Sequence, residues 1–180
     1  MFTSTRVWGI TAIVIAMLQL GAAAQQAPSA GPEARPPDNN PTVQDQELVL
    51  GGWELDLTRS MFSPGPAPRS EIRSYQEEHE GIKAEILTVN ADGSKTHMQY
   101  VASFNDVVAV VTGSQQTDAV RMRKIDPYTA ESQLSFGGQL VGRARRVVSK
   151  DGQTLTITLE RTAPAAVHNV EVFRRIPTAR

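Results

Sequence analysis

Short segments of alternating apolar and polar residues fill the chain between residues 69 and 176, and turn-forming residues separate them. Because side chains alternate between the two faces of a strand, this period of two predicts half-buried β-strands. No segment shows a sustained helical period, so the sequence predicts an all-β fold. The expected strands are residues 70–79, 82–90, 95–104, 119–125, 129–136, 139–148, 153–161 and 168–176.

Tight turns between these segments narrow the architecture. Gly137-Gly138 is typical of a two-residue hairpin, and Asp92-Gly93 and Asp151-Gly152 are further hairpin signals. The strands recur about every 8–12 residues, which fits a sandwich or a barrel. Hairpin connections throughout favour the barrel. We therefore expect a single antiparallel up-and-down β-barrel of roughly 8–10 strands.

The folded domain is expected to span residues 48–177 and to begin with a strand at residues 51–57. Trp53, the largest apolar side chain of that strand, shares one strand face with Leu55 and Leu57. Two glycines before it allow the backbone to turn into the strand. Farther along, residues 107–111 form a continuous apolar run that is too short for a helix. This run predicts a strand that is buried on both faces or folded beneath a loop.

The N-terminus has the pattern of an export signal. Arg6 precedes an apolar stretch at residues 7–20, and the small residues Ala22-Ala23-Ala24 follow it. A membrane anchor is the alternative, but a span needs about 18 or more apolar residues. We expect cleavage after Ala24, which gives a signal peptide at 1–24 and a periplasmic or secreted protein. Residues 25–47 are rich in proline and poor in apolar residues, so they predict a disordered linker.

Composition removes several classes of function. The chain has no cysteine, which excludes disulfides and a lipid-modified cysteine. After the predicted cleavage it carries 17 basic and 19 acidic residues, a net charge of −2. A nucleic-acid-binding protein would show a basic excess, so no nucleic-acid partner is expected. We also expect no stable membrane insertion once the signal peptide has been removed.

A family resemblance rests on three residues and on the order of the strands. Gly51-Gly52-Trp53 at the start of the first strand resembles the G-x-W signature of lipocalins. The whole of residues 48–176 is similar to the calycin layout and to small exported bacterial proteins of lipocalin-like type. The resemblance implies a barrel with an apolar cavity, with Trp53 packed across one end beneath Arg174 or Arg175. Intracellular lipid carriers of this group bind a fatty-acid carboxylate with an Arg and a Tyr on the last strand. The similar positions here hold Glu171 and Phe173, so that clamp is missing.

Arg146 is the candidate binding residue, because it occupies an inward position on the strand 139–148. An unpaired cation inside a barrel is costly, so it needs a partner. One interpretation is a bidentate contact with the acidic head of a ligand. The alternatives are an ion pair with Glu171 or Glu160, or a bulge that turns the side chain outward.

Four more residues are expected to contact a ligand in the cavity: Trp53, Met98, Tyr100 and Phe104. The same side chains would also suit a barrel whose interior is simply filled. His79, His97 and His168 lack metal-ligand spacing, and no nucleophile motif is present, so we expect neither a metal nor a cofactor. The sequence predicts a non-catalytic binding protein for a small apolar or amphipathic ligand. The alternative is a protein-binding or inhibitory barrel with a filled core, which would use the loops 63–68 and 163–167. An isomerase or hydrolase is disfavoured because no catalytic group can be named.

Overall fold

The computed structural model describes residues 48–79 and 81–178 of the chain. Within these residues the regular structure is β-strand alone. The strands are β1 (Gly51–Leu55), β2 (Met61–Ser63), β3 (Ser70–Glu78), β4 (Gly81–Val89), β5 (Lys95–Ala102), β6 (Asn105–Thr112), β7 (Ala119–Asp126), β8 (Thr129–Phe136), β9 (Gln139–Val148), β10 (Thr154–Arg161) and β11 (Val167–Arg175). The predicted signal peptide and linker lie outside the described residues, so both stay predictions.

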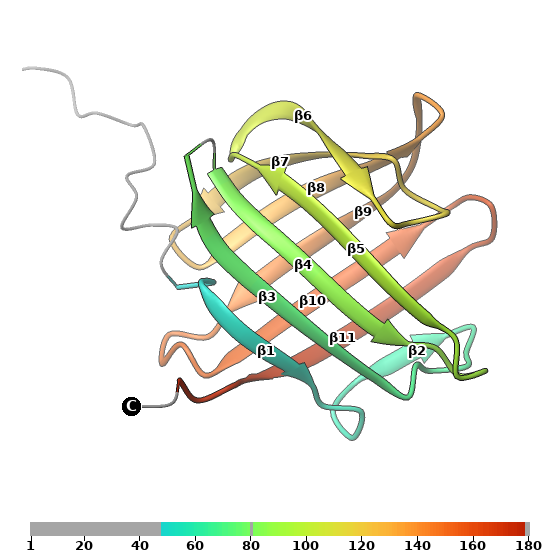
Figure 1. Ribbon diagram of the computed structural model, residues 1–180, viewed down its shortest axis with the longest axis horizontal. Helices are drawn as coiled ribbons and strands as arrows, with labels where there is room; N and C mark the ends of the chain where they lie inside the picture. Colours follow the sequence, from blue (N-terminus) through green and yellow to red (C-terminus); the bar gives the residue numbers. More distant parts are fainter. Residues whose placement is uncertain (1–47, 80, 179–180) are drawn as a thin grey trace, which may run out of the picture. The chain divides into compact units, whose positions relative to one another are not determined.

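Ten strands, β1 and β3 to β11, close into an antiparallel barrel. Figure 1 shows how these strands follow one another around the barrel. From β3 to β11 each strand pairs with the next one along the chain. β1 pairs with β3 on one side and with β11 on the other, where Trp53 lies opposite Arg175 and closes the circle. The predicted all-β class and the up-and-down antiparallel barrel are therefore confirmed.

The short strand β2 is not among the strands that the sequence predicts. β1 pairs with residues 173–175 of β11, and β2 pairs with residues 168–170 of the same strand. Ser60 links the two short strands, because its hydroxyl donates to the carbonyl of Asp56 at 2.7 Å and accepts from the amide of Val172 at 2.9 Å. Together β1 and β2 cover one edge of β11.

The apolar run at residues 107–111 lies in β6, and its predicted burial is wrong. Val107, Val108 and Val110 are 58%, 48% and 72% exposed. Strand alternation turns only Ala109 and Val111 inward, and a register shift in the pairing with β7 lies between Asn105 and Val108. This apolar run is thus part of the barrel wall, and the outer face of the strand is exposed to solvent.

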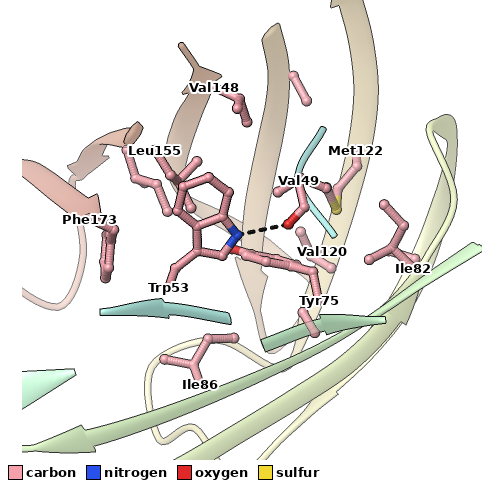
Figure 2. Close-up of a cluster of buried hydrophobic side chains, with 14 of the residues drawn as sticks. Val49, Trp53, Tyr75, Ile82, Ile86, Val120, Met122, Val148, Leu155 and Phe173 are labelled. Atoms are coloured by element: carbon pink, nitrogen blue, oxygen red, sulfur yellow. Dashed lines mark hydrogen bonds between the residues drawn. The ribbon is translucent and has the colours of Figure 1, made fainter. Parts of the chain in front are cut away.

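One end of the barrel is filled by a cluster of apolar side chains around Trp53 (Figure 2). The Trp53 side chain is fully buried, and its indole N–H donates to the carbonyl of Val49 at 2.8 Å. Arg175 lies over the indole ring at 4.2 Å and donates to the carbonyl oxygens of Leu48 and Leu50. Of the two arginines that the family resemblance offered, Arg175 is the one above Trp53, whereas Arg174 lies 3.4 Å from Asp56.

Gly113, which follows β6, lies very close to the backbone of β5. Its φ is +74°, and a Cβ at this position would collide with the carbonyl oxygen of His97. We expect Gly113→Ala to lower the free energy of unfolding by about 2–3 kcal/mol, as measured by urea denaturation. Gly137→Ala is the matched control, because Gly137 also has a positive φ but nothing lies within 4 Å of the added methyl group. If both variants lost the same stability, the close approach at Gly113 would have no energetic effect.

Candidate functional site

A cavity of about 110 Å³ lies inside the barrel, and Tyr75 is among the residues that line it. Side chains from β3 and from β5 to β11 line it, because every second residue of these strands points inward. About half of the residues that line it are polar or charged. The polar and charged members are Arg73, Tyr75, Tyr100, Thr117, Ser132, Arg146, Arg161 and Glu171.

Arg146 points into this cavity from β9, in the inward orientation that the sequence predicts. It is 7% exposed, and its guanidinium lies over the rings of Tyr75 at 5.1 Å and Phe104 at 5.4 Å. Among the described residues it forms no ion pair and donates no side-chain hydrogen bond. Neither carboxylate considered as its partner contacts it, because Glu171 pairs with Arg73 and Glu160 lies 3.7 Å from His168. On the protein side, the rings of Tyr75 and Phe104 contact this buried cation.

Tyr100 lies near Arg146 in the same cavity and supplies a neutral hydroxyl. Burial, reinforced by the neighbouring Tyr75, raises the pKa of Tyr100 to about 12, although Arg146 and Arg73 oppose the shift. The phenol therefore keeps its proton at neutral pH and can donate a hydrogen bond. In the described part of the chain no side chain or carbonyl accepts that bond. A cation and a neutral donor thus face one cavity, both able to bind an anion.

The three other residues predicted to contact a ligand lie in different places. Met98 lines the cavity beside Tyr100. Phe104 is buried beneath Arg146 and positions its guanidinium rather than lining the cavity. Trp53 belongs to the packed end of the barrel and does not reach the cavity. The structure therefore brings together Arg146, Tyr100 and Met98 from the predicted set.

A buried ionic cluster, which the sequence reasoning did not find, forms another wall of the cavity. Arg73 on β3 contacts Glu71 at 2.6 Å and Glu171 on β11 at 3.0 Å, and its guanidinium lies over Phe173 at 4.9 Å. Thr88 donates a further hydrogen bond to Glu71 at 2.9 Å. The available signal was strand alternation, because Glu71 and Arg73 share the inward face with Tyr75.

The charged groups of this cluster shift one another's pKa values. Burial lowers the pKa of Arg73, but the carboxylates of Glu71 and Glu171 and the side chain of Tyr75 outweigh it, so the pKa is raised overall. Burial raises the pKa of Glu171, and the nearby Arg73 limits that rise. Glu171 is thus held as a structural partner of Arg73.

A wider hollow of about 540 Å³ lies next to the cavity, at one end of the barrel. Leu159, Arg161 and Glu171 line both spaces and so stand between them. Pro64, Pro66 and Pro68 form part of the rim, which places the proline-rich segment at the mouth of the barrel. Arg161 donates to the carbonyl of Gln116 at 2.7 Å and fixes a loop beside the opening.

Other kinds of site have little support in the described residues. His79, His97 and His168 are all exposed and lie on separate segments. No group of three or more His, Asp or Glu side chains in residues 48–79 and 81–178 is arranged to hold a metal ion. These residues also contain no helix that is long and apolar enough to cross a membrane.

No protein-family model matches the chain, and no curated protein matches it. The closed antiparallel barrel is compatible with the calycin-like fold that Gly51-Gly52-Trp53 suggests. Function is therefore inferred from the barrel interior itself.

Proposed function

We propose that this protein is an exported, non-catalytic binding protein of lipocalin-like type for a small amphipathic ligand, whose acidic head contacts Arg146. The observation that carries the proposal is a buried guanidinium that lines a cavity without a carboxylate partner among the described residues. Ring contacts with Tyr75 and Phe104 offset part of the cost of burying it. An anionic ligand head would supply the missing charge.

The shape of the interior limits the ligand. A cavity of about 110 Å³ holds a few non-hydrogen atoms beside Arg146 and Tyr100, but no long alkyl chain. The apolar remainder of the ligand would pass Leu159 into the wider hollow that Pro64 and Pro66 border. A short-chain or aromatic carboxylate fits this description, with its carboxylate at Arg146 and its apolar end toward the mouth.

Native mass spectrometry of the mature protein tests the proposal directly. The protein would be purified from the exported fraction of its own host without detergent, and we expect a co-purifying small molecule. Arg146→Met keeps an unbranched side chain but removes the charge, and it should abolish that bound mass. In titrations with a panel of short-chain and aromatic carboxylates, the same variant should bind about 10–100-fold more weakly than the parent protein.

Arg59→Met is the control, because Arg59 is exposed and lines neither the cavity nor either of the other hollows of the barrel. It should leave both the bound mass and the carboxylate affinities unchanged. A bare mass, together with no binding to any member of the panel, would contradict the proposal. Equal losses in the Arg59 and Arg146 variants would also contradict it.

The small volume of the cavity favours a second candidate, a protein-binding or inhibitory module whose core is nearly filled. Its contacts would come from the loops 63–68 and 163–167 at the mouth. Under this alternative the mature protein gives a bare mass on its own and a stoichiometric mass with a protein partner. Mutation of Arg146 would then leave the protein complex intact.

A further inference from the structure

A second polar site lies on the outer wall of the barrel, where two rows of side chains cross the strands β6 to β10. Residues that are directly opposite in an antiparallel pair point to the same face of the sheet. One row runs Asn105, Arg123, Glu131, Arg145 and Thr158, and the neighbouring row runs Val108, Arg121, Gln133, Arg143 and Glu160. Each row therefore places one arginine on β7 and one on β9, with a β8 residue between them.

In the first row the β8 residue is a carboxylate that binds both arginines. One oxygen of Glu131 accepts from Arg123 at 2.8 Å, and the other accepts from Arg145 at 3.0 Å. The Cα atoms of these arginines are two strand spacings apart, which is about 10 Å. The row shows that one carboxylate above β8 spans an arginine pair of this spacing.

In the second row the β8 residue is Gln133, which carries no charge. Arg121 and Arg143 flank it at the same two-strand spacing. Arg121 donates only to the backbone carbonyl of Asp106, at 3.2 Å, and Arg143 has no hydrogen bond or ion pair with the described residues. The second row thus repeats the arginine pair of the first without its carboxylate.

The surroundings of this second row favour a protein carboxylate as the ligand. A hollow of about 520 Å³ lies over both rows, so a protruding segment fits better than a flat lipid surface. Asp106 and Glu160 also line the hollow and repel acidic groups near them, which leaves Gln133 as the favoured position for a carboxylate. Exposed Val108 continues the row on β6, with Val110 beside it on the same face. Apolar contact beside charged recognition is typical of protein interfaces.

We propose that Arg121, Gln133 and Arg143 form a docking site for an acidic segment of a partner protein. A glutamate or aspartate of the partner would lie above Gln133 and bridge Arg121 and Arg143, as Glu131 bridges the arginines in the next row. Apolar side chains beside that residue would pack on Val108 and Val110. This surface is separate from the barrel interior and does not depend on the ligand proposed for Arg146.

Gln133→Glu provides the sharpest test, because the chain's own carboxylate would then occupy the position proposed for the partner. The probe is a short fluorescein-labelled peptide in which a valine pair precedes a run of glutamates, and binding is followed by fluorescence anisotropy. We expect the parent protein to bind this peptide, more weakly as salt is raised. Gln133→Glu and the double variant R121Q/R143Q should each weaken binding by about tenfold or more. The conservative change Gln133→Asn should have little effect.

The double variant R59Q/K95Q removes the same amount of charge from exposed positions outside the hollow and should keep the parent affinity. The proposal is overturned if R59Q/K95Q weakens binding as much as R121Q/R143Q, since only net charge would then matter. It is also overturned if Gln133→Glu binds the peptide normally, or if the parent protein does not bind the peptide at low salt. Binding to vesicles with anionic lipids, without binding to the peptide, would assign the surface to lipid instead.

Discussion

Replacing Arg73 with methionine is expected to lower the free energy of unfolding by about 3–5 kcal/mol at neutral pH. The cause is the buried ionic cluster, in which Arg73 is the shared partner of Glu71 and Glu171. The side chains of all three residues are at most 14% exposed, so water replaces little of the lost interaction. Removal of the single cation leaves two carboxylates together inside the barrel, which costs more than the pair itself contributed.

The same variant should make stability depend on pH in a defined direction. Burial raises the pKa of Glu171, so the folded protein binds this proton more tightly than the unfolded chain does. The contribution of such a group is fully present below its ordinary pKa and is lost as the pH rises through the raised value. Because Arg73 limits that rise, its removal moves the pKa of Glu171 further upward. The Arg73→Met protein should therefore lose stability between mildly acidic and neutral pH more steeply than the parent protein.

Urea denaturation at a mildly acidic and at a neutral pH measures both effects. The double variant R73M/E171Q should recover part of the stability at neutral pH and flatten the pH dependence, because it no longer buries the Glu171 charge. Arg174→Met is the control, since Arg174 is an exposed arginine on β11. A loss below about 1 kcal/mol in Arg73→Met, or an equal loss at both pH values, would contradict this account of the cluster.

Local sequence was enough to predict most of the barrel. The strand over residues 139–148 agrees with β9 at both ends, and Gly137 and Gly138 adopt the positive φ angles that a two-residue hairpin needs. Alternation and turn residues act between near neighbours, so they are visible in the sequence. The strand β2 was missed because it is held by residues 168–170 of β11, which lie far along the chain.

The interior was only partly predictable for the same reason. Alternation alone places Arg146 inside the barrel. Its contacts with Tyr75 and Phe104 depend on how β9, β3 and the turn between β5 and β6 meet. The pairing of Arg73 with Glu171 likewise joins β3 to β11 across the interior. The burial of residues 107–111 could not be predicted, because a continuous apolar run does not indicate which of its two faces lies inside the barrel. Inward charges could be identified from the alternation, whereas their partners required the closed barrel.

Trp53→Ala is expected to lower the free energy of unfolding by about 3–5 kcal/mol, because it removes the largest side chain of the packed barrel end. The loss includes more than the ring. Val49 loses the donor to its carbonyl, and Arg175 loses the aromatic surface beneath its guanidinium. Trp53→Phe keeps an aromatic ring but not the N–H group. Its free energy of unfolding should therefore lie between that of Trp53→Ala and that of the parent protein.

Circular dichroism during urea denaturation is the suitable readout, because the substitution removes the tryptophan that fluorescence would report. Leu57→Ala is the control, since Leu57 is 42% exposed and should cost no more than about 0.5 kcal/mol. A double-mutant cycle with Arg175→Met separates the contact between Arg175 and the indole ring from the other interactions of the two side chains. Trp53 and Arg175 touch directly, so we expect a coupling free energy of about 0.5–3 kcal/mol. Additive losses would mean that Arg175 stabilises the barrel through its hydrogen bonds to the carbonyl oxygens of Leu48, Leu50 and Gly152 and not through the indole ring.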